Sequence, residues 1–164
     1  MRGGLLPPAL LFTAMGLALA FAPRRVWIPS VLALILSAGA VAMSHPLVWA
    51  APAVEGIFAA CWISIVVTSI CVYVTRALSL WAVLLLSLNA GIWASAVTQL
   101  SGSWGDLAKA LPCVLILLPA SWVARRYGTI PLKVVSSWLI AVAVLATTLQ
   151  LLPVTPGYLP DHLE

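Results

Sequence analysis

Charged residues are scarce in this chain. Only 7% of its 164 residues are Asp, Glu, Lys or Arg, whereas 63% are hydrophobic, and the mean hydropathy is +1.14. A soluble domain carries about 25% charged residues, which keep its surface in water. The composition therefore excludes a water-soluble fold and predicts that most of the chain lies in a lipid bilayer.

Motifs for catalysis or for metal and cofactor binding are also missing. The sequence has no Gly-x-Ser-x-Gly, His-Glu-x-x-His, P-loop or dinucleotide fingerprint. Cys61, Cys71 and Cys113 stand singly inside apolar segments, a pattern that fits neither a disulfide framework nor a zinc site. The net charge is +4, and no run of consecutive basic residues is longer than two arginines. We therefore expect no catalytic residues, no metal, no cofactor and no nucleic-acid partner.

Long apolar stretches are what the chain does contain. A helix needs about 20 apolar residues to cross the hydrocarbon layer, and none of the stretches shows the polar alternation of a barrel strand. The sequence predicts an all-α, polytopic integral membrane helix bundle of about six transmembrane helices, which forms a single domain over 1–164 with a short polar tail at 154–164. The six stretches are Leu5–Ala22, Val26–Met43, Val54–Thr75, Ala77–Leu100, Leu107–Ala124 and Val134–Pro153.

Arginines recur at a nearly constant interval between these stretches. Arg25, Arg76 and Arg126 are 51 and 50 residues apart, which predicts three helical hairpins over 1–50, 51–103 and 104–153. Ile-Pro follows both arginine pairs, at Ile28-Pro29 after Arg24-Arg25 and at Ile130-Pro131 after Arg125-Arg126. These matches fit a triplicated hairpin, but proline is also favoured at any helix start. Both explanations remain open at this stage.

The cations are distributed unevenly between the two sides of the membrane. Cytoplasmic loops retain an excess of Lys and Arg. One side carries Arg2 and Lys109 only, whereas the first, third and fifth loops or their margins carry Arg24, Arg25, Arg76, Arg125, Arg126 and Lys133. We therefore expect these loops in the cytoplasm and both termini outside it. Cleavage of the first stretch as a secretory signal after Ala20 is the alternative, and it would reverse every later loop.

Reporter fusions test this orientation. A reporter that fluoresces only in the cytoplasm is expected to be bright after Arg126 and dark after Glu164, because each Lys or Arg costs about 2.5–3.5 kcal/mol at the membrane centre and so holds its loop in place. A fusion after Arg76 serves as a second bright control. Bright fluorescence after Glu164 would mean that a span is missing or that the first one is cleaved.

Small residues recur at four-residue spacing on two of the predicted helices. In lipid, helices associate through close contact at small side chains rather than through the hydrophobic effect. The spacing therefore predicts helix-packing faces on the third and fourth helices. Those faces comprise Gly56, Ala60, Ser64 and Thr68 on the third helix, and Ser87, Gly91 and Ser95 on the fourth.

Four polar residues are candidates for function. Ionisable groups inside a membrane are costly and default to functional hypotheses. Glu55 lies at the start of the third helix, where the helix dipole alone explains an acid. Asn89 is near mid-membrane, where an interhelical hydrogen bond explains it equally well. His45 and Asp106 lie in or near outer loops, where solvation suffices, and Asp106 is placed to pair with Lys109.

These features favour a non-enzymatic, multi-pass protein of a bacterial inner membrane that serves as a subunit or assembly partner of a larger membrane complex. Its expected partners are the lipid bilayer and other membrane subunits or further copies of itself. A small transporter or channel is the first alternative, motivated by Glu55, Asn89 and two prolines in the fifth stretch, because broken helices line cavities in transporters. A lipid-acting membrane enzyme is the least favoured alternative.

Overall fold

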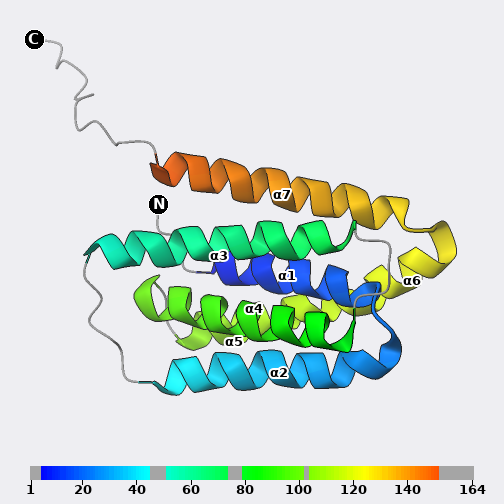
Figure 1. Cartoon of the computed structure of the whole chain (residues 1–164), viewed down its shortest axis with the longest axis horizontal. Helices are drawn as coiled ribbons and strands as arrows, with labels where there is room; N and C mark the ends of the chain where they lie inside the picture. Colours follow the sequence, from blue (N-terminus) through cyan, green and yellow to red (C-terminus); the bar gives the residue numbers. More distant parts are fainter. Residues whose placement is uncertain (1–4, 45–50, 74–78, 102–103, 152–164) are drawn as a thin grey trace, which may run out of the picture.

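The computed structural model describes residues 5–44, 51–73, 79–101 and 104–151, and within these ranges it consists of helices joined by short turns, without a strand. Successive spans run in alternate directions along one common axis (Figure 1). The predicted all-α bundle is therefore confirmed for these residues. The helices are α1 (Leu6–Ala20), α2 (Arg24–Met43), α3 (Ala51–Cys71), α4 (Leu80–Ser101), α5 (Trp104–Ala110), α6 (Leu117–Tyr127) and α7 (Ile130–Leu151), with a 3-10 segment η1 (Leu111–Ile116) between α5 and α6.

Five of the described spans are long and apolar enough to cross a membrane, which indicates a multi-pass membrane protein. They are α2, α3, α4, α7 and the composite span Gly105–Tyr127, which joins α5, η1 and α6. The first predicted span is shorter than expected. α1 has 15 residues and a length of about 22 Å, which is less than the roughly 30 Å of a hydrocarbon core.

Helix α1 ends early because of the residues that follow it. The amides of Phe21 and Ala22 close the last turn on the carbonyls of Ala18 and Leu19. Pro23 has no N–H with which to continue the ladder, and its extended backbone starts α2 instead. The predicted stretch Leu5–Ala22 therefore includes the turn between two helices, because the residues of that turn are as apolar as those of the helix.

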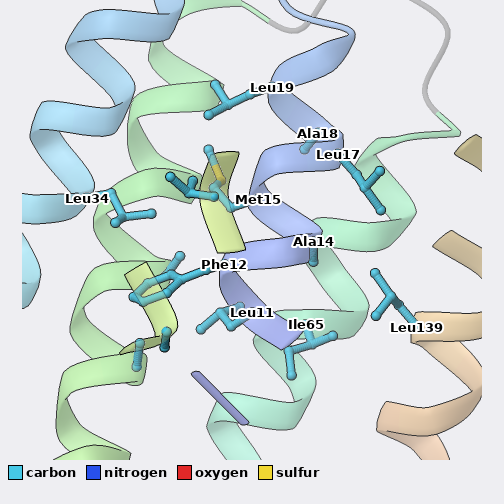
Figure 2. Close-up of a cluster of buried hydrophobic side chains, with 14 of the residues drawn as sticks. Leu11, Phe12, Ala14, Met15, Leu17, Ala18, Leu19, Leu34, Ile65 and Leu139 are labelled. Carbon is cyan, nitrogen blue, oxygen red and sulfur yellow. The ribbon is translucent and has the colours of Figure 1, made fainter. Parts of the chain in front are cut away.

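The core of the bundle is built around α1. Packed against this helix are α3, α4, the η1–α6 segment and α7. Figure 2 shows Phe12 and Met15 directed towards α4, whereas Leu17 lies on the side of α3. The side chains of Phe12 and Met15 are fully buried. A short helix is tolerated here because its neighbours, rather than lipid, surround it.

Helix α2 has a different position, at the edge of the bundle (Figure 1). Its one extensive contact among the described helices is with α4. The two helices run in the same direction, so that Gly91 of α4 lies beside Ser37, and Gln99 of α4 donates a hydrogen bond to the carbonyl of Val41. A single stripe of α2 is buried, consisting of Val26, Ser30, Leu34, Ser37, Ala38 and Ala42. The most extensive contacts, α2 with α4 and α3 with α7, thus join helices of different predicted hairpins.

The fifth span, which contains two prolines, is interrupted by the 3-10 segment η1. Pro112 lies in the first turn of the 3-10 segment η1, between the end of α5 at Ala110 and the start of α6 at Leu117. Proline in a helix interior removes a backbone hydrogen bond and clashes with the preceding turn. Pro119 lies in the first turn of α6, where a missing N–H leaves no bond unmade. The break lies against α1, at Gly16.

Candidate functional site

A groove of about 550 Å³ lies between α3 and α4. Its walls are almost wholly apolar, and small side chains on α3 keep it open. Pockets that bind small molecules have a similar size, roughly 300–1,000 Å³. The lining residues are Ala60, Ile63, Ser64, Val67 and Cys71 of α3, and Ala82, Leu85, Leu86, Asn89 and Trp93 of α4.

The polar part of this groove is a chain of three side chains. Asn89 donates an amide hydrogen to the hydroxyl oxygen of Ser64, which joins α4 to α3. The indole N–H of Trp93, one turn along α4, donates to the Asn89 carbonyl oxygen over 2.9 Å. Since a primary amide has two N–H donors, one Asn89 donor has no partner among the described residues. Asn89 itself is half-buried and lines the groove.

Helix α4 therefore presents two different faces. Ser87, Gly91 and Ser95 are buried on the face that packs against α2. A β-carbon added at Gly91 would lie 2.0 Å from the Ser37 Oγ and 2.5 Å from the Leu34 carbonyl oxygen. The absence of a side chain at Gly91 is what lets the two backbones approach. Asn89 lies on the other face, towards α3.

The small residues of α3 do not form one uniform packing face. Ser64 and Thr68 are buried, and the Thr68 hydroxyl donates to the Ser64 carbonyl over 2.7 Å. Ala60 is half-buried in the groove wall. Gly56 is exposed with open space around its Cα, so the predicted face does not extend to it. A four-residue spacing drifts around a helix of 3.6 residues per turn, and Gly56 lies at the drifted end.

The charged candidates lie away from the groove. Glu55 is exposed near the start of α3, and Asp106 is half-buried in the first turn of α5, with Lys109 in the last. The starts of α3 and α5 lie at the same end of the bundle (Figure 1). His45 lies outside the described residues. The described part of the chain contains no group of three side chains suited to hold a metal ion.

The cations expected in the cytoplasmic loops lie at the opposite end of the bundle. Arg24 and Arg25 start α2, Arg125 and Arg126 end α6, and Lys133 lies in the first turn of α7. These helix ends meet at one end of the bundle in Figure 1. Arg76 falls in a segment that the structure does not describe. Which side of the membrane this end faces remains a prediction.

Two polar features were not predicted from the sequence. Trp93 and Asn89 are four residues apart on one helix, and this spacing was a usable signal for their hydrogen bond. The indole nitrogen of Trp62 is buried and has no partner among the described residues, and no local pattern indicates this. Comparison with family models, curated proteins and solved structures gave no match.

Proposed function

We propose that this chain is a non-enzymatic, multi-pass subunit or assembly partner of a larger complex in a bacterial inner membrane. In this proposal, the α3–α4 groove receives a transmembrane helix of the partner. The observation that carries the proposal is that Asn89 lines an apolar groove and has a second amide N–H without a partner among the described residues.

The chemistry of this donor favours one of the two occupants that a membrane supplies. A lipid tail fills an apolar groove equally well, but it has no acceptor for an N–H. A polar group without a partner in an apolar medium costs free energy. A helix that brings a Ser, Thr, Asn or Gln side chain supplies the acceptor, and such side chains commonly bond across transmembrane helices. The small side chains of Ala60 and Ser64 leave room for close approach.

The position of α1 weighs against the transporter or channel alternative. A pore surrounded by three hairpins requires polar surface at the centre of the bundle. Instead α1 occupies that centre, where Leu11, Phe12 and Met15 are fully buried (Figure 2). The polar residues that motivated this alternative lie elsewhere, with Glu55 exposed and Asn89 in the groove.

Substitution of Asn89 by alanine tests the proposal. We expect N89A to weaken the complex about threefold to twentyfold, because interhelical hydrogen bonds in membranes contribute about 0.6 to 1.7 kcal/mol. The measurement is native mass analysis of the full-length protein, purified in mild detergent. I92A is the matched control, since Ile92 is exposed on the same helix and does not line the groove.

Site-specific cross-linking distinguishes a partner helix bound in the groove from a protein that co-purifies by chance. A photoreactive residue at Val67, in the groove wall, is expected to give a discrete protein adduct that N89A diminishes. The same residue at Val144, on an exposed face of α7, is expected to give none. Adducts with lipid alone at Val67, or a wild-type protein that is always a lone monomer, would overturn the proposal.

A further inference from the structure

Positive charge gathers at one end of the bundle with no acidic residue described beside it. The five described cations at that end are Arg24, Arg25, Arg125, Arg126 and Lys133. The two described carboxylates, Glu55 and Asp106, belong to the starts of α3 and α5, at the opposite end (Figure 1). Among the described residues, no carboxylate is therefore placed to neutralise the cationic end.

Three of these cations share one corner, where α6 turns into α7. Arg125 and Arg126 lie in the last turn of α6. Gly128 follows with a φ of 83°, a conformation that glycine adopts without strain. It lets α7 start at Ile130, with Lys133 in its first turn. The turn thus brings three positive charges of a nine-residue segment to one edge of the bundle.

Neighbouring groups hold two of these cations in place. The Arg125 Nε donates to the Ser121 carbonyl oxygen over 3.1 Å, and its Nη2 approaches the Ser121 Oγ at 3.4 Å. The Lys133 Nζ lies 6.0 Å from the centre of the Tyr73 ring, and the Tyr73 hydroxyl donates to the Lys133 carbonyl oxygen over 2.6 Å. Because a guanidinium has five N–H donors, Arg125 keeps donors for an external anion.

The corner also carries exposed aromatic and aliphatic side chains. The aromatic rings suit the level of the lipid headgroups, and the aliphatic side chains suit the acyl chains. Trp122 and Tyr127 are exposed and pack edge to face, with ring centres 6.0 Å apart. Such rings sit at the level of the lipid headgroups. Ile130 and Val134 of α7, which follow Tyr127 within seven residues of the chain, are also exposed. Charge and apolar surface are therefore adjacent, as they are in a phospholipid.

We propose that this corner, formed by Arg125, Arg126 and Lys133 with Trp122 and Tyr127, binds the phosphodiester of an anionic phospholipid. Arginine binds phosphate oxygens through charge-assisted hydrogen bonds, and basic pockets between transmembrane helices bind anionic headgroups. The exposed Ile130 and Val134 would contact the acyl chains, which favours a lipid over a soluble phosphate.

Lipid retention by the purified full-length protein tests this proposal. Native mass analysis in detergent is expected to show phosphatidylglycerol bound in preference to phosphatidylcholine. The double variant R125Q/R126Q is expected to weaken retention roughly a hundredfold, the change given by about 1.5 kcal/mol for each charge-assisted hydrogen bond that is lost. Wild-type retention should also fall as salt concentration rises, because salt screens exposed charges.

The matched control is R24Q/R25Q, which removes the same charge from the same end of the bundle but from α2. Retention is expected to change little in this variant.

Equal losses in both double variants would show that net charge alone attracts the lipid, and equal binding of phosphatidylcholine would show no headgroup preference. Displacement of the lipid by inorganic phosphate at equal concentration would assign the corner to a soluble anion. Each of these three results overturns the proposal. If the double variant does not insert, R126Q alone gives the test, with an expected loss of about tenfold.

Discussion

Replacement of Gly91 by alanine is expected to detach α2 from the rest of the bundle. The new β-carbon would lie 2.5 Å from the Leu34 carbonyl oxygen and 3.0 Å from the Ala38 amide nitrogen, which are backbone atoms that cannot rotate away. Overpacking costs about 1–3 kcal/mol, occasionally more, and we expect about 3 kcal/mol here. The melting temperature in detergent should fall by roughly 6–12 °C.

Two other glycines supply the controls. Gly39 of α2 and Gly56 of α3 have open space where a β-carbon would lie. G39A and G56A should therefore be neutral or slightly stabilising, because alanine is the better helix former. The variant S37A in the G91A background removes the nearest atom, the Ser37 Oγ, but leaves the Leu34 carbonyl in place. The double variant should therefore regain only part of the melting temperature that G91A loses. An unchanged melting temperature for G91A would contradict the close α2–α4 contact.

Replacement of Gly16 by alanine should disturb the centre of the bundle. A β-carbon there would lie 2.7 Å from the Ile116 Cγ2 and 2.9 Å from the Val114 carbonyl oxygen, both in the 3-10 segment. We expect a loss of about 1–3 kcal/mol in the free energy of unfolding. The expected loss is smaller than for G91A because the nearest backbone atom would lie 2.9 Å from the new β-carbon, compared with 2.5 Å at Gly91. Thermal unfolding in detergent measures it.

A double-mutant cycle with Ile116 locates the cause of this loss. I116A removes the methyl group that the new β-carbon would meet, so G16A should cost less in the I116A background than in the wild type. Residues in contact show coupling energies of about 0.5–3 kcal/mol. Purely additive effects would indicate that α1 does not pack on the interrupted span at this point.

The spans were predictable because the signal for a membrane helix is local. Hydrophobic length identified every long helix, and Pro112 indicated the break in the fifth span. The extent of α1 was overestimated, because Phe21 and Ala22 are as apolar as the helix that they follow. Where both lipid and core are apolar, hydropathy does not distinguish a turn from a helix end.

Helix partners were not predictable for a related reason. Leu34 of α2 is fully buried and Leu36 is 69% exposed, yet the two are the same residue type. A bilayer imposes no polar face, so the sequence carries little of the periodicity that identifies the inner side of a soluble helix. Gly91 indicated a close contact on α4, but not that α2 supplies it.

The candidate site was predicted only in part. Asn89 was identified because an amide near mid-membrane is rare and costly. Its bond to Ser64 depends on how α3 lies beside α4, which is a tertiary property. The sequence placed Ser64 in a packing stripe, whereas its hydroxyl also takes part in the polar chain of the groove.

The attachment of α2 to a single neighbour also sets an order of events during biosynthesis. α2 is complete at Met43, but 48 further residues must be made before Gly91, its main contact, exists. At about 5–20 residues per second, this takes about 2–10 s. Since transmembrane helices can insert before they associate, α2 spends these seconds alone in lipid, with the Ser30 and Ser37 hydroxyls unpacked. A later helix thus recruits an earlier one during assembly, and newly made chains would be more open to membrane proteases until this contact forms.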